Sequence, residues 1–288
     1  MRTLGVIPGD TLNPDHPGLS SADTYFMAET HGLCTAWAYH KHKIVLFLAA
    51  MRHHRDTLRN NGETVTYYEL TDTPYEELLK QTIIDQDIDK VLTYEPKDKS
   101  FSAVRQACQA TQTEVEYVDN PNMLTGREAF SAYTEDNPYH HATFYKWQRR
   151  RLNILVDDGA PENGKWSFDQ DNRKPLTDPS QTPSLPSTEH GDHVKRVKAV
   201  VAATFPDHPG SVENFWLPVT HSGAQRWYQA FLNERFDRFG PYQDAINESE
   251  TFAYHAAISP LLNIGLLNPG DVVDQAVAHY HEHNTHYP

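Results

Sequence analysis

Short apolar segments alternate with amphipathic segments over the first 118 residues, and this alternation restricts the fold more than any other feature. The apolar segments are rich in β-branched and aromatic residues, whereas the amphipathic ones repeat apolar residues every three or four positions. We expect strands over 3–8, 25–28, 64–70, 90–94 and 114–118, and helices over 35–59, 75–86 and 101–111. Such alternation is typical of βαβ units, in which helices cover both faces of a parallel sheet. The sequence therefore predicts a doubly wound, Rossmann-like α/β domain with a five-stranded parallel sheet over residues 1–125.

The pattern changes after this domain. Residues 126–192 show little hydrophobic periodicity and many Pro, Asp, Asn and Ser residues, so we interpret them as an interdomain connector that its aromatic residues order in part. Beyond this connector, helical periodicity returns over 194–204, 222–239 and 271–280. We expect residues 193–288 to form a partial all-α domain.

Composition excludes several classes of protein. The longest apolar run, residues 44–50, is far shorter than the roughly 20 residues that cross a bilayer. The N-terminal sequence lacks a signal-peptide cleavage pattern, so a soluble, cytoplasmic protein is expected. Cys34 and Cys108 are the only cysteines and neither belongs to a CxxC pair, which argues against a cysteine-ligated metal or cluster in this stretch.

One basic cluster stands out from an acidic chain. A formal charge of −14 argues against a surface that binds DNA throughout, because phosphate binding depends on the local density of Lys and Arg. The cluster consists of Lys146, Arg149, Arg150 and Arg151, interleaved with the aromatic residues Tyr145 and Trp147. It is a candidate DNA contact, and the alternative is the solvated face of a helix.

The loop after the first predicted strand is a candidate ligand site. Doubly wound sheets bind ligands beyond the carboxyl ends of their strands, and residues 8–12 follow the first strand directly. Gly9, Asp10 and Leu12 are therefore candidate ligand contacts, although Gly9 and Asp10 would also suit a simple turn.

The histidine-rich segment 279–286 raises the question of a metal site. Histidines at alternate positions of a helix point to different sides, unlike a pair four residues apart that can share one zinc ion. A solvated terminus is the favoured interpretation, and no metal site is predicted.

Four stretches of the chain carry a further signal: residues 9–12, residues 39–44 with 50–53, residues 144–150 with 164–175, and residues 215–220 with 255–267. Taken in order, they resemble the deoxyribodipyrimidine photolyase-related proteins, a family that contains bacterial (6-4) photolyases and cryptochromes with an iron–sulfur cluster. A single match of this kind would be weak, whereas four in the family's order are specific.

The resemblance implies chemistry that periodicity does not show. In these proteins the α/β domain holds a light-harvesting chromophore, commonly 6,7-dimethyl-8-ribityllumazine, and the helical domain holds FAD. The excited reduced flavin donates an electron to a damaged pyrimidine pair that is flipped out of the DNA. Asp10 matches an acidic loop residue of the family, but the family's polar lumazine contacts align with Ala28, Leu33 and Ala36. We therefore expect an antenna pocket that is empty, reshaped or filled by another compound.

The flavin site is represented by one segment. Residues 259–262 resemble the flavin-binding turn of photolyases, which implies FAD contacts from His255, Ser259, Pro260, Leu261 and Asn263. By itself the segment would suit a buried helix after a kink at Pro260 equally well.

Family members continue well beyond the length of this chain. The resemblance places the remaining flavin contacts and the cysteine ligands of the iron–sulfur cluster in that continuation, so the chain is expected to be a fragment, a split-gene product or a degenerate relative. The leading hypothesis is a flavoprotein of light-dependent DNA repair or blue-light response, with photolyase activity uncertain for this chain alone. The alternative is a non-enzymatic α/β protein that binds a nucleotide or chromophore.

Overall fold

The computed structural model describes residues 1–97 and 102–283, and its internal contacts divide the chain into two units. Unit 1 comprises residues 1–123, 187–225 and 259–268, and unit 2 comprises residues 124–186, 226–258 and 269–288. Each unit is thus assembled from separate parts of the sequence.

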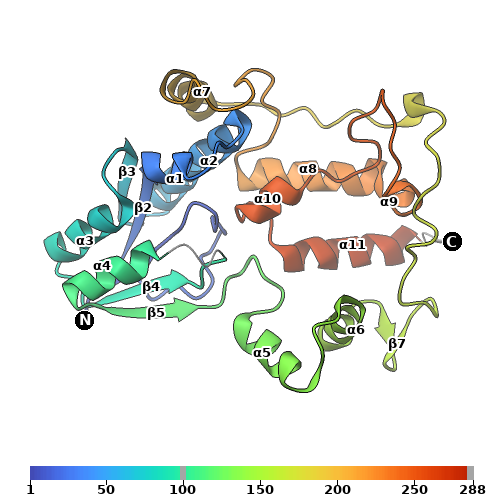
Figure 1. The fold of residues 1–288 in the computed structure, drawn as a ribbon, viewed down its shortest axis with the longest axis horizontal. Coiled ribbons are helices and arrows are strands. Elements are labelled where there is room, and N and C mark those ends of the chain that lie inside the picture. The colour runs from blue at the N-terminus through green and yellow to red at the C-terminus, as the bar shows by residue number, and fades with distance from the viewer. Residues whose placement is uncertain (98–101, 284–288) are drawn as a thin grey trace. The chain divides into compact units, whose positions relative to one another are not determined.

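Unit 1 is built on one parallel sheet (Figure 1). Its strands are β1 (Thr3–Val6), β2 (Thr24–Thr30), β3 (Val65–Thr71), β4 (Lys90–Tyr94) and β5 (Glu114–Val118). Every neighbouring pair is parallel, and the order is β3-β2-β1-β4-β5. The predicted five-stranded parallel sheet is confirmed. Because the chain winds outward in opposite directions from the centre, the strand order reverses between β1 and β4, which is where ligands of such sheets bind.

Helices cover the sheet because alternate strand residues point to opposite faces. On one face, α3 (Tyr75–Asp85) and α4 (Ala103–Thr111) lie side by side (Figure 1). They bury a core that includes Leu4, Phe26 and Val91 of the sheet. Tyr25 and Met27 alternate with Phe26 and are also buried. They face the other side, on which α1 (His31–Thr35) and α2 (Lys41–Asn60) connect β2 to β3.

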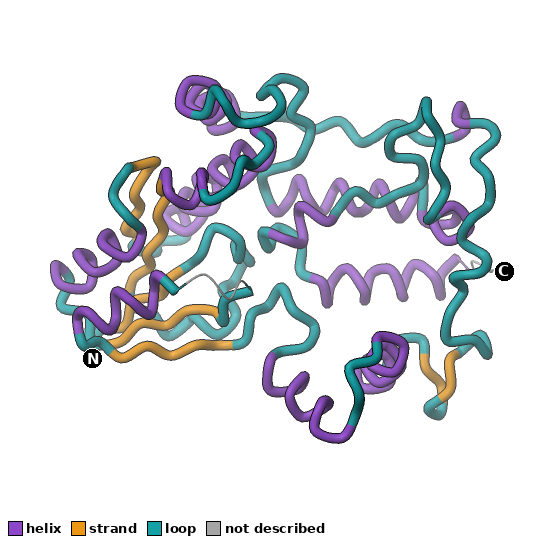
Figure 2. The backbone as a smooth tube through the Cα atoms, viewed as in Figure 1, coloured by secondary structure: helices purple, strands orange, loops and turns teal. Residues whose placement is uncertain are grey.

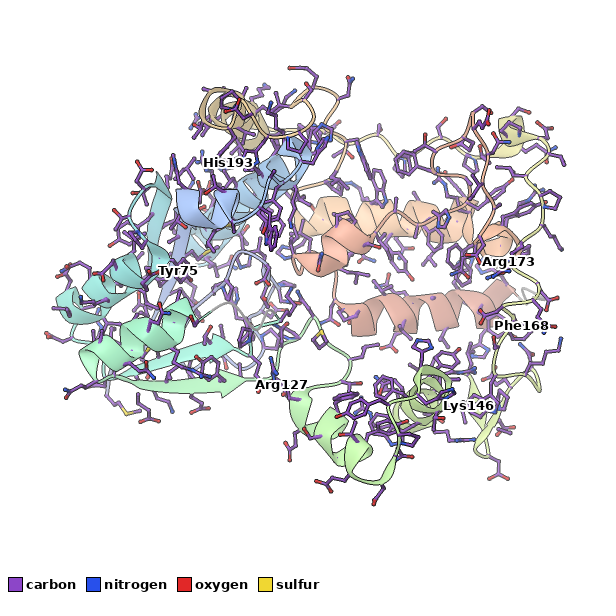
Figure 3. The ribbon with its side chains drawn as sticks, in the orientation of Figure 1. Tyr75, Arg127, Lys146, Phe168, Arg173 and His193 are labelled. Carbon is purple, nitrogen blue, oxygen red and sulfur yellow. The ribbon has the colours of Figure 1, made fainter. Side chains whose placement is uncertain are left out.

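Residues 187–225 add a further layer over α2. Helix α7 (Asp192–Thr204) packs on α2 (Figure 1) and buries Val194, Val197 and Val201, which share one helical face. His193, labelled in Figure 3, lies with Nε2 at 2.6 Å from Oδ2 of Asp56 on α2. The helix predicted over 194–204 is therefore present, and in the structure it packs on α2 of the α/β unit. The short helix α10 (Ser259–Asn263) also belongs to this unit.

Unit 2 is mainly helical, with long loops between its helices (Figure 2). Its elements are α5 (Arg127–Asp136), α6 (His141–Leu152), β6 (Val156–Asp157), β7 (Ala160–Pro161), a 3₁₀ turn (Pro179–Gln181), most of α8 (His221–Glu234), α9 (Phe236–Tyr242) and α11 (Pro269–His283). Trp227, Tyr228 and Phe231 of α8 are buried. Helices α5 and α6 lie in the range that shows little hydrophobic periodicity. Aromatic contacts rather than an aliphatic stripe join the two helices, since Tyr133 of α5 contacts Phe144 and Trp147 of α6.

Within residues 1–97 and 102–283, no helix has both the length and the apolar character that a membrane crossing requires.

A candidate ligand cavity in the α/β unit

A cavity of about 470 Å³ opens at the carboxyl edge of the sheet in unit 1. The ends of β1, β2, β4 and β5 all contribute to it, so it spans the point at which the strand order reverses. Tyr75, at the start of α3 (Figure 3), also lines it, as do residues of α2. This volume is in the range of small-molecule sites.

The predicted loop lies at this cavity. Gly9 and Asp10 line it, whereas Leu12 is fully buried and is not part of the lining. The backbone N–H of Leu12 donates to the carbonyl of Ile264 at 2.8 Å, which ties the loop to the segment that follows α10. A Cβ at position 9 would lie 2.7 Å from Sδ of Met51 on α2, so a larger residue there would require the Met51 side chain to shift.

Lys97, which the sequence reasoning did not single out, holds the loop in place. Its Nζ donates to the carbonyls of Asp10 at 2.6 Å and Asn263 at 2.7 Å, and lies 3.3 Å from the Asp10 carboxylate. Burial lowers the pKa of Lys97, and the Asp10 carboxylate opposes that shift. The available signal was its position directly after the fourth predicted strand, at the edge where a parallel sheet binds ligands.

Glu29 is a buried carboxylate at the cavity wall, and its oxygens are already hydrogen-bonded. Arg52 of α2 donates to it through two nitrogens, each at 2.8 Å. Tyr67 Oη and the backbone N–H of Leu70, at 3.1 Å, donate as well. The hydrogen bond to Glu29 raises the pKa of Arg52 further above its usual range, and the pair fixes α2 against the sheet.

The remaining wall of the cavity is mostly apolar. Ala28, Leu33 and Ala36 all line it, so the three positions at which the resemblance implied lost polar contacts do face one cavity. Cys34 and Trp37 line it too, and burial raises the pKa of the Cys34 thiol to about 12. A thiol with this pKa is un-ionised at neutral pH and offers little polar recognition.

Comparison with known proteins assigns the chain to a family. A family model described as deoxyribodipyrimidine photo-lyase-related protein matches residues 5–217, which is more than half of the chain. The chain belongs to this family.

Individual relatives agree with the assignment. The (6-4) photolyase of Agrobacterium fabrum (strain C58) is 28% identical over 292 residues, which cover 98% of this chain and 58% of that protein. A cryptochrome of Synechocystis sp. PCC6803 (TM-score 0.61, 12% identity) and a class III photolyase of Agrobacterium tumefaciens (TM-score 0.59, 16% identity) share the fold over 98% of this chain. The match covers 56% and 54% of those two structures, so this photolyase-related chain spans little more than half the length of its relatives.

The candidate flavin contacts of this photolyase-related chain fall into different units. His255 belongs to unit 2, and Ser259, Pro260, Leu261 and Asn263 belong to unit 1. The side chain of Leu261 is completely buried, and the carbonyl of Asn263 already accepts from Lys97. Ser259 is exposed at the start of α10, but a helix of five residues has too small a dipole to bind a pyrophosphate strongly. Within the unit 1 segment, the side chains of Ser259 and Asn263 are exposed.

The basic cluster lies on α6 in unit 2, and its arginines have partners within that unit. Arg149 donates to the carbonyls of Ile154 and Leu155, at 3.0 and 2.6 Å. Arg150 donates to the carbonyl of Gly159, and Arg151 donates to the carbonyl of Leu124. Arg149 and Arg150 both stack on Trp166, and Arg151 stacks on Trp147. The guanidinium groups thus bind the loops next to α6. They also place positive charge on the surface of this helix, on which Lys146 lies as well (Figure 3).

Three histidines gather beneath the loop that lines the cavity. The ring of His54 lies 5.0 Å from that of His16 and 5.5 Å from that of His221. Both ring nitrogens of His54 are buried without a hydrogen-bond partner in the described residues. Burial lowers the pKa of His54 well below its usual value and lowers that of His16 to about 4. In the part of the chain that the structure describes, no set of three or more His, Cys, Asp or Glu side chains is placed to hold a metal ion.

The histidine-rich terminus is described up to His283. On α11 the rings of His279 and His283 stack with centroids 4.1 Å apart, and His286 lies outside the described residues.

Proposed function

We propose that this chain acts in light-dependent repair of UV-damaged DNA or in blue-light response. The observation that carries the proposal is the family match over residues 5–217, with a (6-4) photolyase 28% identical over 98% of the chain. Damaged DNA and FAD are the partner and the cofactor that follow, and the cytoplasm is the compartment.

Within this proposal, unit 1 and unit 2 would bind different partners. In unit 1, the cavity with Gly9 and Asp10 at its wall is suited to a small antenna chromophore, because it is enclosed by several elements of a rigid sheet domain. Polar contacts for a ribityl chain are few, since alanine or leucine occupies positions 28, 33 and 36. In unit 1 the flavin would take contacts from Ser259, and in unit 2 the DNA would take contacts from the basic cluster on α6.

Binding to damaged DNA tests the proposal directly. A fluorescently labelled duplex would be irradiated with UV light, and its binding to the chain would be followed by fluorescence anisotropy beside the same duplex without damage. We expect tighter binding to the irradiated duplex, because damaged bases stack and pair poorly and are easier to extrude. Equal binding to the two duplexes, or none to either, would count against a role in repair and favour a chromophore-binding protein without enzymatic function.

A further inference from the structure

Helix α11 of unit 2 (Figure 1) brings two of its histidines together. His279 and His283 are four residues apart, which places their side chains one turn apart on the same side of the helix. Their rings lie face to face, with centroids 4.1 Å apart and planes inclined by 20°. His281 lies on a different side, where its Nε2 is 3.9 Å from the carboxylate of Glu162. The segment therefore contains one pair with the spacing at which two histidines share a metal ion.

A hydrogen bond to the backbone prepares His283 as a ligand. Its Nδ1 lies 3.0 Å from the carbonyl oxygen of His279. Because a carbonyl oxygen only accepts, Nδ1 carries the hydrogen, and the lone pair of the neutral ring lies on Nε2. Histidines that bind metals usually hold their second nitrogen in this way, which fixes both the tautomer and the orientation of the ring. Nε2 of His283 is thus the atom that would bind the ion.

Packing against α9 orients His279. Its ring meets that of Phe236 edge to face, with centroids 5.4 Å apart. His279 is half-buried, whereas His283 is exposed. A ring that is already held in place loses little freedom when it binds an ion. The exposed partner leaves room for the water molecules that complete the coordination of an ion with two protein ligands.

The charge around the pair favours a cation. Helix α11 contains three carboxylates, of Asp271, Asp274 and Glu282, and neither Lys nor Arg. The carbonyl groups at the end of a helix carry a partial negative charge, and both histidines lie in the last two turns of α11. A divalent cation bound here would therefore be attracted by the helix end and would meet no cationic lysine or arginine of the same helix.

Imidazole nitrogen selects among metal ions. Zn²⁺, Ni²⁺ and Cu²⁺ accept nitrogen donors readily, whereas Mg²⁺ and Ca²⁺ prefer oxygen donors. Among the residues that the structure describes, no third His, Cys, Asp or Glu is placed to join the pair, so water would supply the other ligands. A site of this kind exchanges its ion with the solvent.

We propose that His279 and His283 bind a divalent transition-metal ion such as Zn²⁺ on the surface of unit 2, and that the ion fixes the last turns of α11. The spacing of this pair was overlooked in the sequence, where the alternate positions 279, 281 and 283 argued against a site. The inference is independent of the proposed function, because neither DNA nor a chromophore takes part in it.

Titration with metal ions tests this inference. The purified chain, without an added histidine tag, would be titrated with Zn²⁺ and with Mg²⁺ by isothermal titration calorimetry. We expect Zn²⁺ to bind at a site that Mg²⁺ does not occupy. His283→Ala should weaken the affinity for Zn²⁺ about 10-fold or more, because it removes one of two protein ligands. Equal affinity of His283→Ala and the wild-type chain for Zn²⁺, or no binding of Zn²⁺ to the wild-type chain, would overturn the proposal.

Two further variants distinguish a metal ligand from a histidine with a structural role. His283→Cys keeps a zinc ligand at this position, since a thiolate binds Zn²⁺, and it should restore most of the affinity. His281→Ala is the matched control, because it removes a histidine of the same helix outside the pair, and should leave the affinity unchanged. Positions 281 and 283 are exposed, so these changes spare the core, and circular dichroism verifies the fold. If His281→Ala weakened binding as much as His283→Ala, or if His283→Cys restored nothing, the pair would not be the site and the inference would be wrong.

Discussion

Two charged residues at the cavity wall of unit 1, Glu29 and Lys97, are hydrogen-bonded to other parts of the same unit. The Glu29 carboxylate accepts hydrogen bonds from Arg52, from the Tyr67 hydroxyl and from the backbone N–H of Leu70. The Lys97 ammonium group donates to the backbone carbonyl of Asp10 and forms an ion pair with the Asp10 carboxylate. Charged side chains next to a cavity are usually candidates for catalysis. Here their partners are within the fold, and their role is to position the wall.

The buried histidines make stability dependent on pH. A base whose pKa is lower in the folded than in the unfolded state takes up protons preferentially when unfolded, so stability falls as pH decreases. For His16, a shift from 6.5 to about 4 removes roughly 2 kcal/mol of unfolding free energy at pH 5. His54 and His221 shift in the same direction because of burial. We expect the melting temperature to be steady above pH 7 and to fall between pH 6.5 and pH 4.

Substitution of His54 by Phe tests the cause. Phe has no buried nitrogen without a partner and nothing to protonate, so His54→Phe should weaken the fall in melting temperature without lowering stability at pH 7. His141→Gln, at an exposed position of α6, is the control and should leave the pH profile unchanged. An identical profile for His54→Phe and the wild-type chain would show that this cluster is not the source.

Among the elements, α6 combines a structural role with the proposed contact to DNA. Its arginines donate to the carbonyls of neighbouring loops, so a change at Arg149 removes bonds to Ile154 and Leu155. Lys146 is on the same helix and is the better probe of DNA binding.

We expect Lys146→Glu to weaken binding to DNA by an amount that shrinks as the salt concentration rises, with the salt slope reduced by about 1. The melting temperature should stay unchanged, whereas Arg149→Glu should lower both affinity and melting temperature. Anisotropy titrations at several salt concentrations measure the slopes. Lys195→Glu reverses an exposed lysine of α7 and serves as the control. Equal effects of Lys146→Glu and Lys195→Glu would mean that the basic cluster is an ordinary solvated face.

The elements of the sheet domain were predictable, and those around the cavity only in part. Strands β4 and β5 have the predicted bounds, because β-branched and aromatic residues are bounded by clear helical patterns. Helices α5 and α6 were missed, since rings such as Phe130 and Phe144 hold them together without an aliphatic period. The loop at Asp10 was predicted, but its link to Lys97 was not, because a contact 87 residues away leaves no local pattern.

For the whole molecule, retention of FAD is the property that tests the proposed cofactor. FAD is large, and tight binding requires burial of most of its surface by walls from several directions. Ser259 offers net hydrogen bonding worth ~1 kcal/mol, which is small against an association cost of at least ~4 kcal/mol. We therefore expect the purified chain to carry little FAD after gel filtration, measured by absorption near ~450 nm.

Added FAD should bind weakly. Ser259→Asp should lower the affinity for FAD further, because its carboxylate would repel the phosphates. Ser131→Asp on the exposed surface of α5 is the control. A full equivalent of FAD on the wild-type chain, with loss on Ser259→Asp alone, would show that this chain completes its own flavin site.

The discontinuous make-up of unit 1 also has a consequence for synthesis on the ribosome. The sheet is translated by residue 123, but α7 and α10, which belong to the same unit, follow only by residue 268. At ~5–20 residues per second the nascent chain waits roughly 4–16 s for α7, which ends at residue 204, and roughly 7–28 s for α10, which ends at residue 263. Until α7 has been made, the face of α2 that it later covers stays open to chaperones and to other nascent chains. Slow synthesis over residues 124–204 would lengthen this exposure, so the yield of folded protein should respond to codon choice there more than within residues 1–123.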